Sequence, residues 1–301
     1  MGKRILITGG TGFIGQRLCQ ALLAGESRLT VLSRQDPVTV RSLCGRVEAA
    51  TSLDTLHGHP GFDAVINLAG EGIAEKRWSR ARKQQLVDSR VALTRTLAEV
   101  ICSWEQKPEV LVSGSAVGFY GDQGHARVNE STTPKDEFTH RMCADWEKEA
   151  LALEEHGVRV CLSRTGLVVG PDGGFLQKML LPFRLGLGGR LGNGQQYMPW
   201  IHRDDVVDAL LWMLKTPRAC GPYNVVSPNP ATNREFTRTL AGVLHRPALL
   251  PAPPFALKLA MGEMSRLLLT GQKAVPDRLT DAGFSFLFPE LGPALRDALG
   301  S

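Results

Sequence analysis

The sequence predicts an α/β fold, a doubly wound parallel sheet with a smaller C-terminal α/β lobe. Three observations support this prediction. Short β-branched runs alternate with amphipathic helical segments through the first half of the chain, as in a parallel sheet covered by helices on both faces. The first of these runs leads directly into the glycine-rich stretch GGTGFIG. From about Gly170 onward, glycine- and proline-rich stretches separate shorter elements, which indicates a second lobe.

The elements of the first half are expected to follow one another as strand, helix and strand. Strands are predicted at residues 4–8, 29–33, 64–69, 109–115 and 159–165, with helices that include 13–25 and 89–104. A strand near residues 222–227 is expected to return to the main sheet. The predicted division is therefore residues 1–169 and residues 170–301, with the second part ending in a helical tail.

The helical tail carries leucine and methionine at helical spacing in FALKLAMGEMSRLLLTG, residues 255–271. Such a stripe fits core packing, a lid over a cleft or the face of a homodimer. These three interpretations remain open at the level of the sequence.

The composition is that of a globular protein with enough apolar material for a sizeable core. Of the 301 residues, 43% are hydrophobic and 22% are charged, and the formal net charge is +5. The basic residues are dispersed, which argues against a nucleic-acid partner. No apolar run reaches the length of a membrane span, so no membrane partner is expected. The six cysteines lack Cys-x-x-Cys and metal-ligand spacing, which predicts reduced thiols, no metal and a cytoplasmic location.

The glycine-rich stretch places Gly9, Gly12 and Gly15 between a predicted strand and a predicted helix. Glycines at this spacing let backbone N–H groups approach a pyrophosphate that rests on the helix N-terminus. Residues 1–169 are therefore predicted to form a dinucleotide-binding domain of the Rossmann type. The expected cofactor contacts in this stretch are Gly9, Thr11, Gly12, Phe13 and Ile14. The spacing resembles the extended, epimerase-like branch of the short-chain dehydrogenase/reductase superfamily.

The end of the second predicted strand carries Ser33-Arg34. An enzyme that uses NAD normally has Asp or Glu there for the ribose 2′-hydroxyl. A guanidinium forms charge-assisted hydrogen bonds with a 2′-phosphate, which a carboxylate would repel. The sequence therefore predicts NADP(H) as the cofactor, bound through Ser33 and Arg34.

Two further segments resemble cofactor-binding segments of the superfamily. In VINLAG, residues 65–70, Leu68 and Ala69 are expected to line the edge of the cofactor site. In RKQQLVDSRVALT, Arg90 stands near the position where common extended members use Asn, and Gln85 lies about one turn before it. Both side chains are expected to face the cofactor.

The segment VLVSGSAVGFYGD, residues 110–122, resembles the fifth-strand segment that carries the superfamily's catalytic Ser or Thr. Ser113 and Ser115 both qualify, and Ser115 fits the pattern better. A hydroxyl at this place can hydrogen-bond a substrate carbonyl or alcohol. We expect Ser115 to orient the substrate and Ser113 to contact the cofactor.

The superfamily's Tyr-x-x-x-Lys pair is absent from this chain. Its three tyrosines, Tyr120, Tyr197 and Tyr223, are each followed four residues later by Gly, Ile or Ser. When Glu147 is matched to a Glu near the end of the family's helical motif, Thr139 and Cys143 take the places of the pair. Any acid or base must then come from another residue. The candidates in the sequence are His140, Cys143, Tyr120, Glu71 and His202, of which His140 titrates in the useful range.

The segment GNGQQYMPWIHRDDVVDAL also departs from the common extended enzymes, because Met198 stands where they use an Arg to hold a sugar nucleotide's diphosphate. Together with EKRW, GFYGD, LLPFRLGLGG and the tail, it resembles the atypical epimerase-family proteins related to bacterial YfcH. The resemblance covers nearly the whole chain. It implies an NADP(H)-binding core with a small substrate lobe, and it places Val168 beside the nicotinamide end of the cofactor.

Two functions fit these observations. The first is an NADP(H)-dependent, epimerase-like oxidoreductase acting on an unknown small polar carbonyl or alcohol. The second is a non-catalytic protein that binds NADP(H) as a sensor or partner module. The two interpretations share the cofactor site and differ only in the consequence of the missing Tyr-x-x-x-Lys pair.

Overall fold

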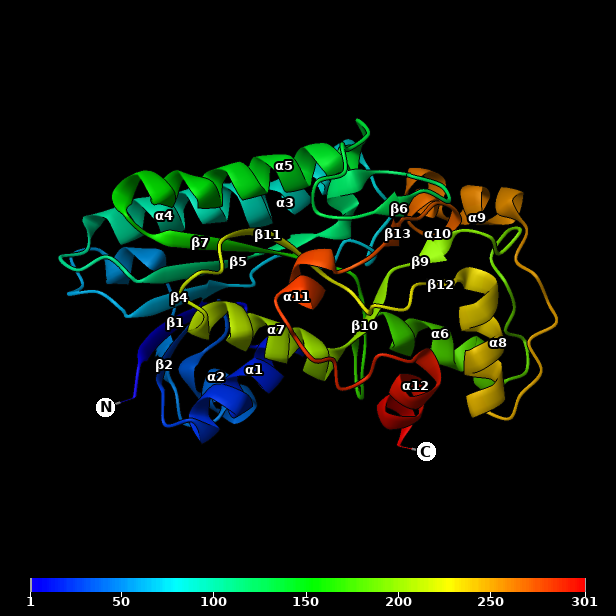
Figure 1. Ribbon diagram of the computed structural model, residues 1–301, viewed down its shortest axis with the longest axis horizontal. Coiled ribbons are helices and arrows are strands. Elements are labelled where there is room, and N and C mark those ends of the chain that lie inside the picture. The colour runs from blue at the N-terminus through cyan, green and yellow to red at the C-terminus, as the bar shows by residue number, and fades with distance from the viewer. Residues whose placement is uncertain (1, 301) are drawn as a thin grey trace.

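Seven parallel strands form the central sheet in the order β11–β7–β5–β4–β1–β2–β3 (Figure 1). The computed structural model describes residues 2–300. The sheet strands are β1 (Arg4–Thr8), β2 (Arg28–Leu32), β3 (Glu48–Ala50), β4 (Ala64–Asn67), β5 (Val110–Ala116), β7 (Arg159–Thr165) and β11 (Gly221–Val225). This order confirms the predicted doubly wound sheet, and it reverses between β1 and β4. Ligands of such sheets bind outside the carboxyl ends of the strands at that reversal.

Helices cover both faces of the sheet (Figure 1). One face carries α1 (Phe13–Ala24), α2 (Pro37–Cys44) and α7 (Arg203–Lys215), and the other carries α3 (Arg80–Val87), α4 (Leu93–Ser103) and α5 (Phe138–Leu151). Each helical layer packs on the sheet through its own apolar core. Because both faces of the sheet are buried, central strands such as RILIT and VLVSGSA are almost entirely inaccessible to solvent.

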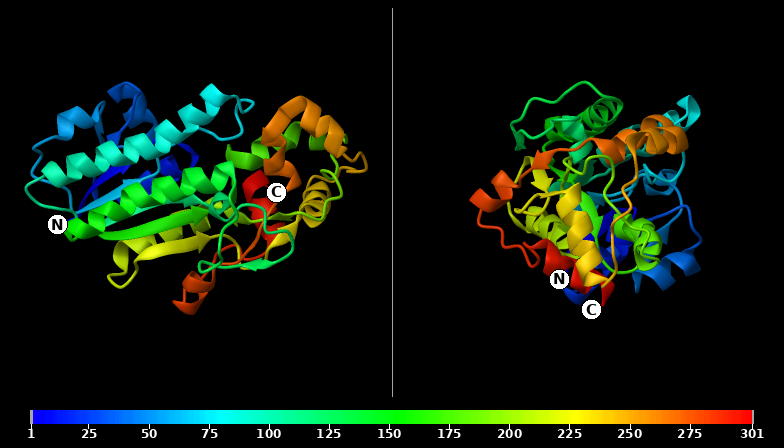
Figure 2. Two further views of the ribbon diagram at one scale, coloured as in Figure 1. Left: turned by 90° about the horizontal axis from the view of Figure 1, so that it is seen from above. Right: turned by 90° about the vertical axis from the view of Figure 1, so that its right-hand side faces the viewer.

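A smaller lobe lies at one end of the sheet (Figure 2). Its strands and those that link it to the core form short pairs, β8 with β10, β9 with β12 and β6 with β13. The bounds are β6 (Arg127–Val128), β8 (Leu167–Val169), β9 (Tyr197–Met198), β10 (Trp200–His202), β12 (Ala231–Thr232), β13 (Lys273–Ala274), α6 (Gly174–Arg184), α8 (Asn233–Val243), α9 (Pro254–Met261), α10 (Arg266–Leu269), α11 (Asp277–Asp281) and α12 (Leu291–Leu299). A separate apolar core around Trp200 and Phe236 holds the lobe together.

The chain passes more than once between the lobe and the sheet. After α6, helix α7 packs on α1 and on the sheet, and β11 pairs in parallel with β7 at the sheet edge. The strand expected near residues 222–227 thus occupies Gly221–Val225. A division of the chain at residue 170 stays a prediction, because elements on both sides of it build the sheet.

The helix expected at residues 89–104 has two parts. A π-helical turn spans Asp88–Ala92, and α4 follows from Leu93 to Ser103. A π-helical turn rotates the side chains that it carries relative to a regular helix, and such turns often occur at functional sites. Ser89 and Arg90 lie in this turn.

Two searches of residues 2–300 gave negative results. Among the helices there, none has both the length and the apolar character that crossing a membrane requires. In the same range, no three His, Cys, Asp or Glu side chains are grouped in a way that would hold a metal ion.

Candidate functional site

A cavity of about 520 Å³ lies at the carboxyl ends of β1, β2 and β4, where the strand order reverses. Seven of the residues expected to contact the cofactor line it, namely Gly9, Thr11, Gly12, Ser33, Arg34, Leu68 and Ala69. The connection after β3 contributes residues 51–54, and Glu71 and Ser89 complete the opposite wall. The cavity therefore has the place and most of the wall that the sequence predicts for a dinucleotide site.

The glycine-rich loop approaches its neighbours too closely for side chains. A Cβ atom on Gly15 would lie 2.2 Å from the carbonyl oxygen of Gly9, and one on Gly9 would lie 2.6 Å from the carbonyl group of Leu68. Gly9 also has a φ of +71°, which favours glycine. At the N-terminus of the twelve-residue α1, Gly12 provides no side-chain cap. The first N–H groups of α1 are thus available to an anion such as a pyrophosphate.

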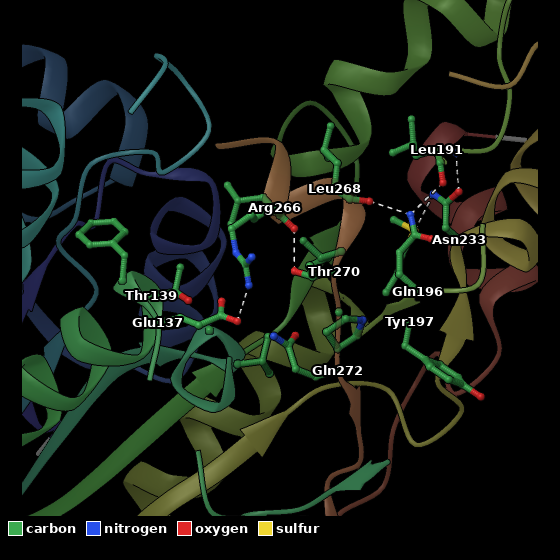
Figure 3. Close-up of a pocket in the computed structure, with 18 of the residues that line it drawn as sticks. Glu137, Thr139, Leu191, Gln196, Tyr197, Asn233, Arg266, Leu268, Thr270 and Gln272 are labelled. Carbon is green, nitrogen blue, oxygen red and sulfur yellow. Dashed lines mark hydrogen bonds and ion pairs between the residues drawn. The ribbon is translucent and has the colours of Figure 1, made fainter. Parts of the chain in front are cut away.

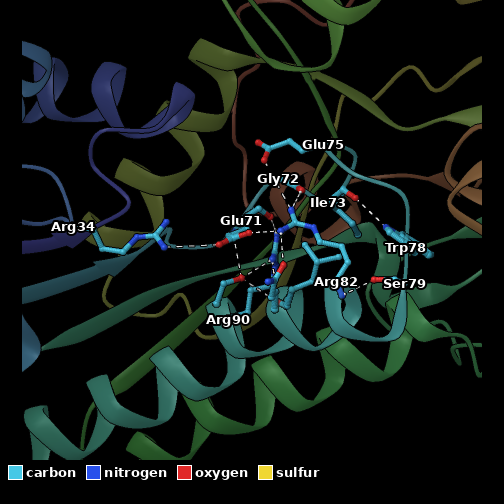
Figure 4. A network of polar contacts seen from close by, with 12 residues as sticks. Arg34, Glu71, Gly72, Ile73, Glu75, Trp78, Ser79, Arg82 and Arg90 are labelled. Atoms are coloured by element: carbon cyan, nitrogen blue, oxygen red, sulfur yellow. Dashed lines mark hydrogen bonds and ion pairs between the residues drawn. The ribbon is translucent and has the colours of Figure 1, made fainter. Parts of the chain in front are cut away.

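Arg34 reaches across the cavity toward Glu71 (Figure 4). Its side chain is 90% exposed, and its Nη1 lies 3.8 Å from Oε1 of Glu71. The other carboxylate oxygen of Glu71 accepts a hydrogen bond from the buried Arg82. This hydrogen bond and the charges of Arg82 and Arg34 lower the pKa of Glu71. Arg34 is therefore held only by a long, solvent-screened ion pair and is free to turn toward an anionic ligand.

We expect Arg34→Ala to weaken NADPH binding about ten- to a hundredfold, because a charge-assisted contact contributes roughly 1.5–3 kcal/mol. NADH affinity should change little, since NADH lacks the 2′-phosphate. The measurement is a fluorescence titration of both dinucleotides, with the exposed Arg218→Ala as the control. Equal losses for NADPH and NADH would contradict the assignment of Arg34 to the phosphate.

Neither Gln85 nor Arg90 lines the cavity. Arg90 belongs to a polar network beside it (Figure 4), and Gln85 joins this network through Arg82. Arg90 donates to the carbonyl oxygens of Leu86 and Glu71 at 3.1 and 2.7 Å, and burial lowers its pKa. Gln85 accepts from Arg82 at 3.4 Å. In this arrangement the two arginines fix the loop after β4. A direct contact of either Gln85 or Arg90 with the cofactor stays a prediction.

Ser113 and Ser115 are buried in β5 and line neither of the two cavities described here. Ser113 Oγ donates to the carbonyl oxygen of Gly114 at 3.3 Å. Ser115 Oγ donates to Oε1 of Glu147 at 2.6 Å, and Glu147 forms a buried ion pair with Arg164. The Ser115 hydroxyl is therefore engaged inside the protein, and its expected contact with a substrate would require it to leave Glu147.

A second cavity, of about 470 Å³, opens between the core and the small lobe (Figure 3). Its core wall comes from the turn after β5 and the start of α5, and its lobe wall comes from α6, β9 and α10. Apolar side chains form much of the lining, namely Trp78, Val117, Phe138, Leu167, Phe175, Leu191, Met198, Pro199, Leu267 and Leu268. Thr139, at the place expected for the missing tyrosine, also lies in this wall.

Glu137 is a lining carboxylate at the N-terminus of α5 in this second cavity. Its Oε1 accepts from the backbone N–H of Asp122 at 3.2 Å and from Nη2 of Arg266 at 2.6 Å (Figure 3). Both of these hydrogen bonds are accepted by the same carboxylate oxygen, Oε1. Arg266 belongs to α10, so this ion pair joins the core to the tail across the cavity.

None of the five acid or base candidates from the sequence is among the residues that line the second cavity. His140 Nδ1 lies 2.7 Å from the carbonyl oxygen of Phe119. Burial raises the pKa of Cys143 and of Tyr120 to about 12. Glu71 is bound by Arg82, as described above. His202 is fully buried and pairs with Asp297 at 3.1 Å, and burial lowers its pKa.

Phe13, Ile14 and Val168 lie where the core meets the lobe. Phe13 packs on the glycines that precede α6, because a Cβ on Gly173 would lie 2.5 Å from its ring. Ile14 and Val168 pack on the apolar core below the sheet, and Val168 in β8 pairs with Ile201 in β10. Contacts of these three residues with the cofactor stay predictions.

The sequence did not single out Glu137 or Arg266. They are 129 residues apart, and neither belongs to a motif of the superfamily. The only available signal was the position of Glu137, which directly precedes the helix that should carry the catalytic pair. The pairing itself depends on how the tail folds back over the core.

Comparison with family models gives two matches. Residues 5–227 match the NAD dependent epimerase/dehydratase family, and residues 252–298 match a domain of unknown function, DUF1731. The second match covers the tail that closes the cavity around Arg266.

Related proteins align along almost the whole chain. An epimerase family protein of Staphylococcus saprophyticus is 39% identical over 297 residues, which is 98% of this chain and 99% of that protein. One from Mycobacterium tuberculosis is 38% identical over 292 residues, which is 97% and 96% of the two chains.

Solved structures show the same arrangement. A human epimerase family protein, SDR39U1, crystallised with NADPH, has a TM-score of 0.91 at 35% identity, covering 99% of both chains. A nucleoside-diphosphate sugar epimerase of Corynebacterium glutamicum has a TM-score of 0.79 at 27% identity, covering 100% of this chain and 59% of that one. UDP-glucuronic acid 4-epimerase of Bacillus cereus, at 18% identity and a TM-score of 0.78, shares the fold.

Proposed function

The chain belongs to the NAD dependent epimerase/dehydratase family, and on that premise we propose that it is an NADP(H)-dependent, epimerase-like oxidoreductase of a small carbonyl or alcohol. One observation carries the proposal. A cavity beside the glycine-rich loop and a second cavity, whose wall combines apolar side chains with Glu137, lie along the same carboxyl edge of the sheet. The first accounts for the cofactor and the second for a substrate.

The choice of NADP(H) rests on the charges around the first cavity. Arg34 is the cation in its lining, and Ser33 adds a hydroxyl beside it. A 2′-phosphate placed there gains a guanidinium that otherwise has only the 3.8 Å ion pair with Glu71. The human relative crystallised with NADPH supports this choice.

The nicotinamide end of the cofactor would lie between the two cavities. A dinucleotide whose adenosine lies beside β2 extends along the strand ends toward β5. There, Gly118 and Leu167 already line the second cavity, and Val168 follows Leu167 in β8. NADP(H) would supply a hydride when bound, and Gly118, Leu167 and Val168 would help to select the carbonyl compound that lies beside the nicotinamide.

Glu137 is the residue that we assign to proton transfer. A carboxylic acid can give its proton to the oxygen of a carbonyl that is being reduced, and the carboxylate can take it back in the reverse direction. In this assignment Oε2 exchanges the proton, while Arg266 and the N–H of Asp122 hold Oε1 in place. Ser115 then has a structural role, because its hydroxyl already donates to Glu147.

The second cavity favours a small substrate over a nucleotide sugar. Its two arginines, Arg141 and Arg266, are paired with Asp136 and Glu137 at 2.5 and 2.6 Å. Met198 lies in the wall, and its sulfur accepts a hydrogen bond from the amide of Asn233. Neither arginine is therefore unpaired for a diphosphate, and the apolar lining fits a carbonyl compound with little charge.

A non-catalytic NADP(H)-binding module is the second candidate function. The observation that favours it is the burial of residues that were expected to be catalytic. The hydroxyl of Ser115 donates to Glu147, and burial raises the pKa of Cys143 to about 12. Such a protein would keep the cofactor cavity intact and use NADPH occupancy as its signal.

The test that separates the two functions is hydride transfer. The purified protein is incubated with NADPH deuterated at the nicotinamide C4 and a panel of small aldehydes and ketones, and the products are analysed by mass spectrometry. We expect deuterium in at least one product, with NADPH preferred over NADH. Tight NADPH binding without transfer to any compound of the panel would favour the binding module, and absence of NADPH binding would refute both functions.

A further inference from the structure

Large apolar side chains are concentrated on one end of the small lobe. Nine of the large hydrophobic residues described in the structure are exposed, and seven of them lie in two stretches of the lobe. We call these seven the end patch: Leu181, Leu185, Leu187, Leu249, Leu250, Phe255 and Leu259. Their exposed fractions range from 56% to 82%. A cluster of this kind marks an interaction surface rather than the scattered exposure that every protein shows.

The two stretches that carry the end patch lie side by side although they are far apart in sequence. The chain after α6 runs beside the chain before α9, with Leu191 bridged to Ala252. Ala252 N–H donates to the carbonyl oxygen of Arg190 at 2.9 Å, and a Cβ on Gly186 would touch Pro247. The right-hand view of Figure 2 shows this end of the molecule, where α9 lies beside the connection that leads into it.

Helix α9 is the most exposed part of the end patch. None of its residues, Pro254–Met261, is buried, and Phe255 and Leu259 are one turn apart. A helix that buries no residue on its own protein gains little stability from packing. The apolar character of α9 is therefore accounted for by a partner outside the chain.

The charges around the end patch have one sign. No Asp or Glu occurs between Asp172 and Asp204 or between Glu235 and Glu263. The exposed cations of these stretches include four near the ends of α6, α8 and α9, namely Arg184, Arg190, Arg246 and Lys258. In the part of the chain that the structure describes, none of the ion pairs includes any of these four.

From this combination we propose that the end patch docks on the surface of a membrane that contains anionic lipids. Leucine and phenylalanine side chains enter the boundary between headgroups and acyl chains, while arginine and lysine contact the anionic headgroups. A second copy of the chain is a poorer occupant, because a twofold dimer apposes the same patch on both subunits and would place cation against cation. A lipid surface also needs no matching shape.

Docking of this kind differs from the membrane span that the sequence excludes. It uses side chains from α6, α9 and the connections between them, which no single run of the sequence contains. It also places the lipid surface close to the second cavity, since Leu191, which lines that cavity, is bridged to the chain before α9. The proposal does not depend on the proposed activity.

The experiment is co-sedimentation of the full-length protein with vesicles of phosphatidylcholine, with and without an equal part of phosphatidylglycerol. We expect binding to the mixed vesicles that weakens as salt rises, and little binding to pure phosphatidylcholine. Replacing Arg184, Arg246 or Lys258 with serine should lower the partition coefficient about fivefold each. Phe255→Ser should lower it by a similar or larger factor.

Arg218→Ser, on an exposed residue outside the end patch, is the matched control and should leave the partition coefficient unchanged. NADPH affinity checks that each variant is folded, because none of these residues lines the cofactor cavity. Failure of the wild-type protein to bind mixed vesicles would overturn the proposal. A dimer in solution that Phe255→Ser dissociates, without vesicle binding, would overturn it as well and would assign the patch to a second copy.

Discussion

Replacing Glu147 with glutamine is expected to lower the free energy of unfolding by about 3–5 kcal/mol, because it leaves the charge of Arg164 buried without a partner. The two side chains are each only 6% exposed, and Arg164 donates to both carboxylate oxygens at 2.8 Å. Burial opposes the charge of Arg164, but the hydrogen bonds and charge of Glu147 outweigh it, so the pKa of the guanidinium is raised.

The same carboxylate anchors a chain of buried polar groups. Ser115 donates to Glu147, Arg164 donates to the phenol of Tyr120 at 3.0 Å, and Tyr120 donates to Asn224 at 2.7 Å. This chain connects β5, α5, β7 and β11 through the interior of the protein. Loss of Glu147 would thus leave several buried donors without their acceptor, which raises the cost of the substitution.

Urea denaturation followed by tryptophan fluorescence measures the effect. Two control substitutions distinguish the loss of this buried ion pair from the loss of an exposed ion pair and from the loss of a single buried hydrogen bond. Glu149, on the same helix as Glu147, forms a partly exposed ion pair with Arg95 of α4, and Glu149→Gln should cost less than about 1 kcal/mol. Ser115→Ala removes only one hydrogen bond and should cost about 1–2 kcal/mol. If Glu147→Gln lowered the free energy of unfolding no more than Glu149→Gln, another group would have to stabilise the charge of Arg164.

Glu137→Gln is expected to reduce kcat for the proposed hydride transfer about a hundred- to ten-thousand-fold, the usual contribution of a general acid or base. The amide keeps the size and the hydrogen-bond acceptor of the side chain but cannot supply or take a proton at neutral pH. NADPH affinity should stay within about twofold of wild type, since Glu137 does not line the cofactor cavity. Steady-state and single-turnover kinetics with the substrate found in the deuterium assay provide the measurement.

Two neighbouring substitutions show whether the carboxylate acts chemically or through its ion pair. Asp136→Asn removes an exposed lining carboxylate one residue away and should leave kcat unchanged. Arg266→Gln breaks the ion pair with Glu137 but keeps the carboxylate, so it should raise KM more than it lowers kcat. If Arg266→Gln and Glu137→Gln reduced kcat equally, Glu137 would be a positioning residue rather than the acid.

The cofactor cavity was largely predictable because its residues depend on local rules. A strand, three glycines and a helix fix the geometry of the loop through the few residues that connect them, and Arg34 follows directly from the end of β2. Small residues after β4 were expected at the cavity edge, and Leu68 and Ala69 do line it. Arg90 was harder to place, because the π-helical turn at Asp88–Ala92 changes the direction of its side chains.

The second cavity was not predictable in the same way. The sequence identified the loss of the Tyr-x-x-x-Lys pair and matched Thr139 to the place of its tyrosine, and the structure places Thr139 in the cavity wall. It gave no means of pairing Glu137 with Arg266, which requires the tail to fold back over the core. It also gave no sign that Ser115 would turn inward, since its partner Glu147 is 32 residues away on another element.

By itself the sequence determined the doubly wound sheet, the glycine loop and the arginine at the end of β2, because periodicity and turn chemistry act over short stretches of chain. Only the tertiary structure decided which polar groups form hydrogen bonds or ion pairs inside the protein and which line a cavity. That choice depends on which distant side chains meet in a buried space, where a charge such as Arg164 must find a partner. It is the reason why Ser115 belongs to the buried network and Glu137 to the cavity.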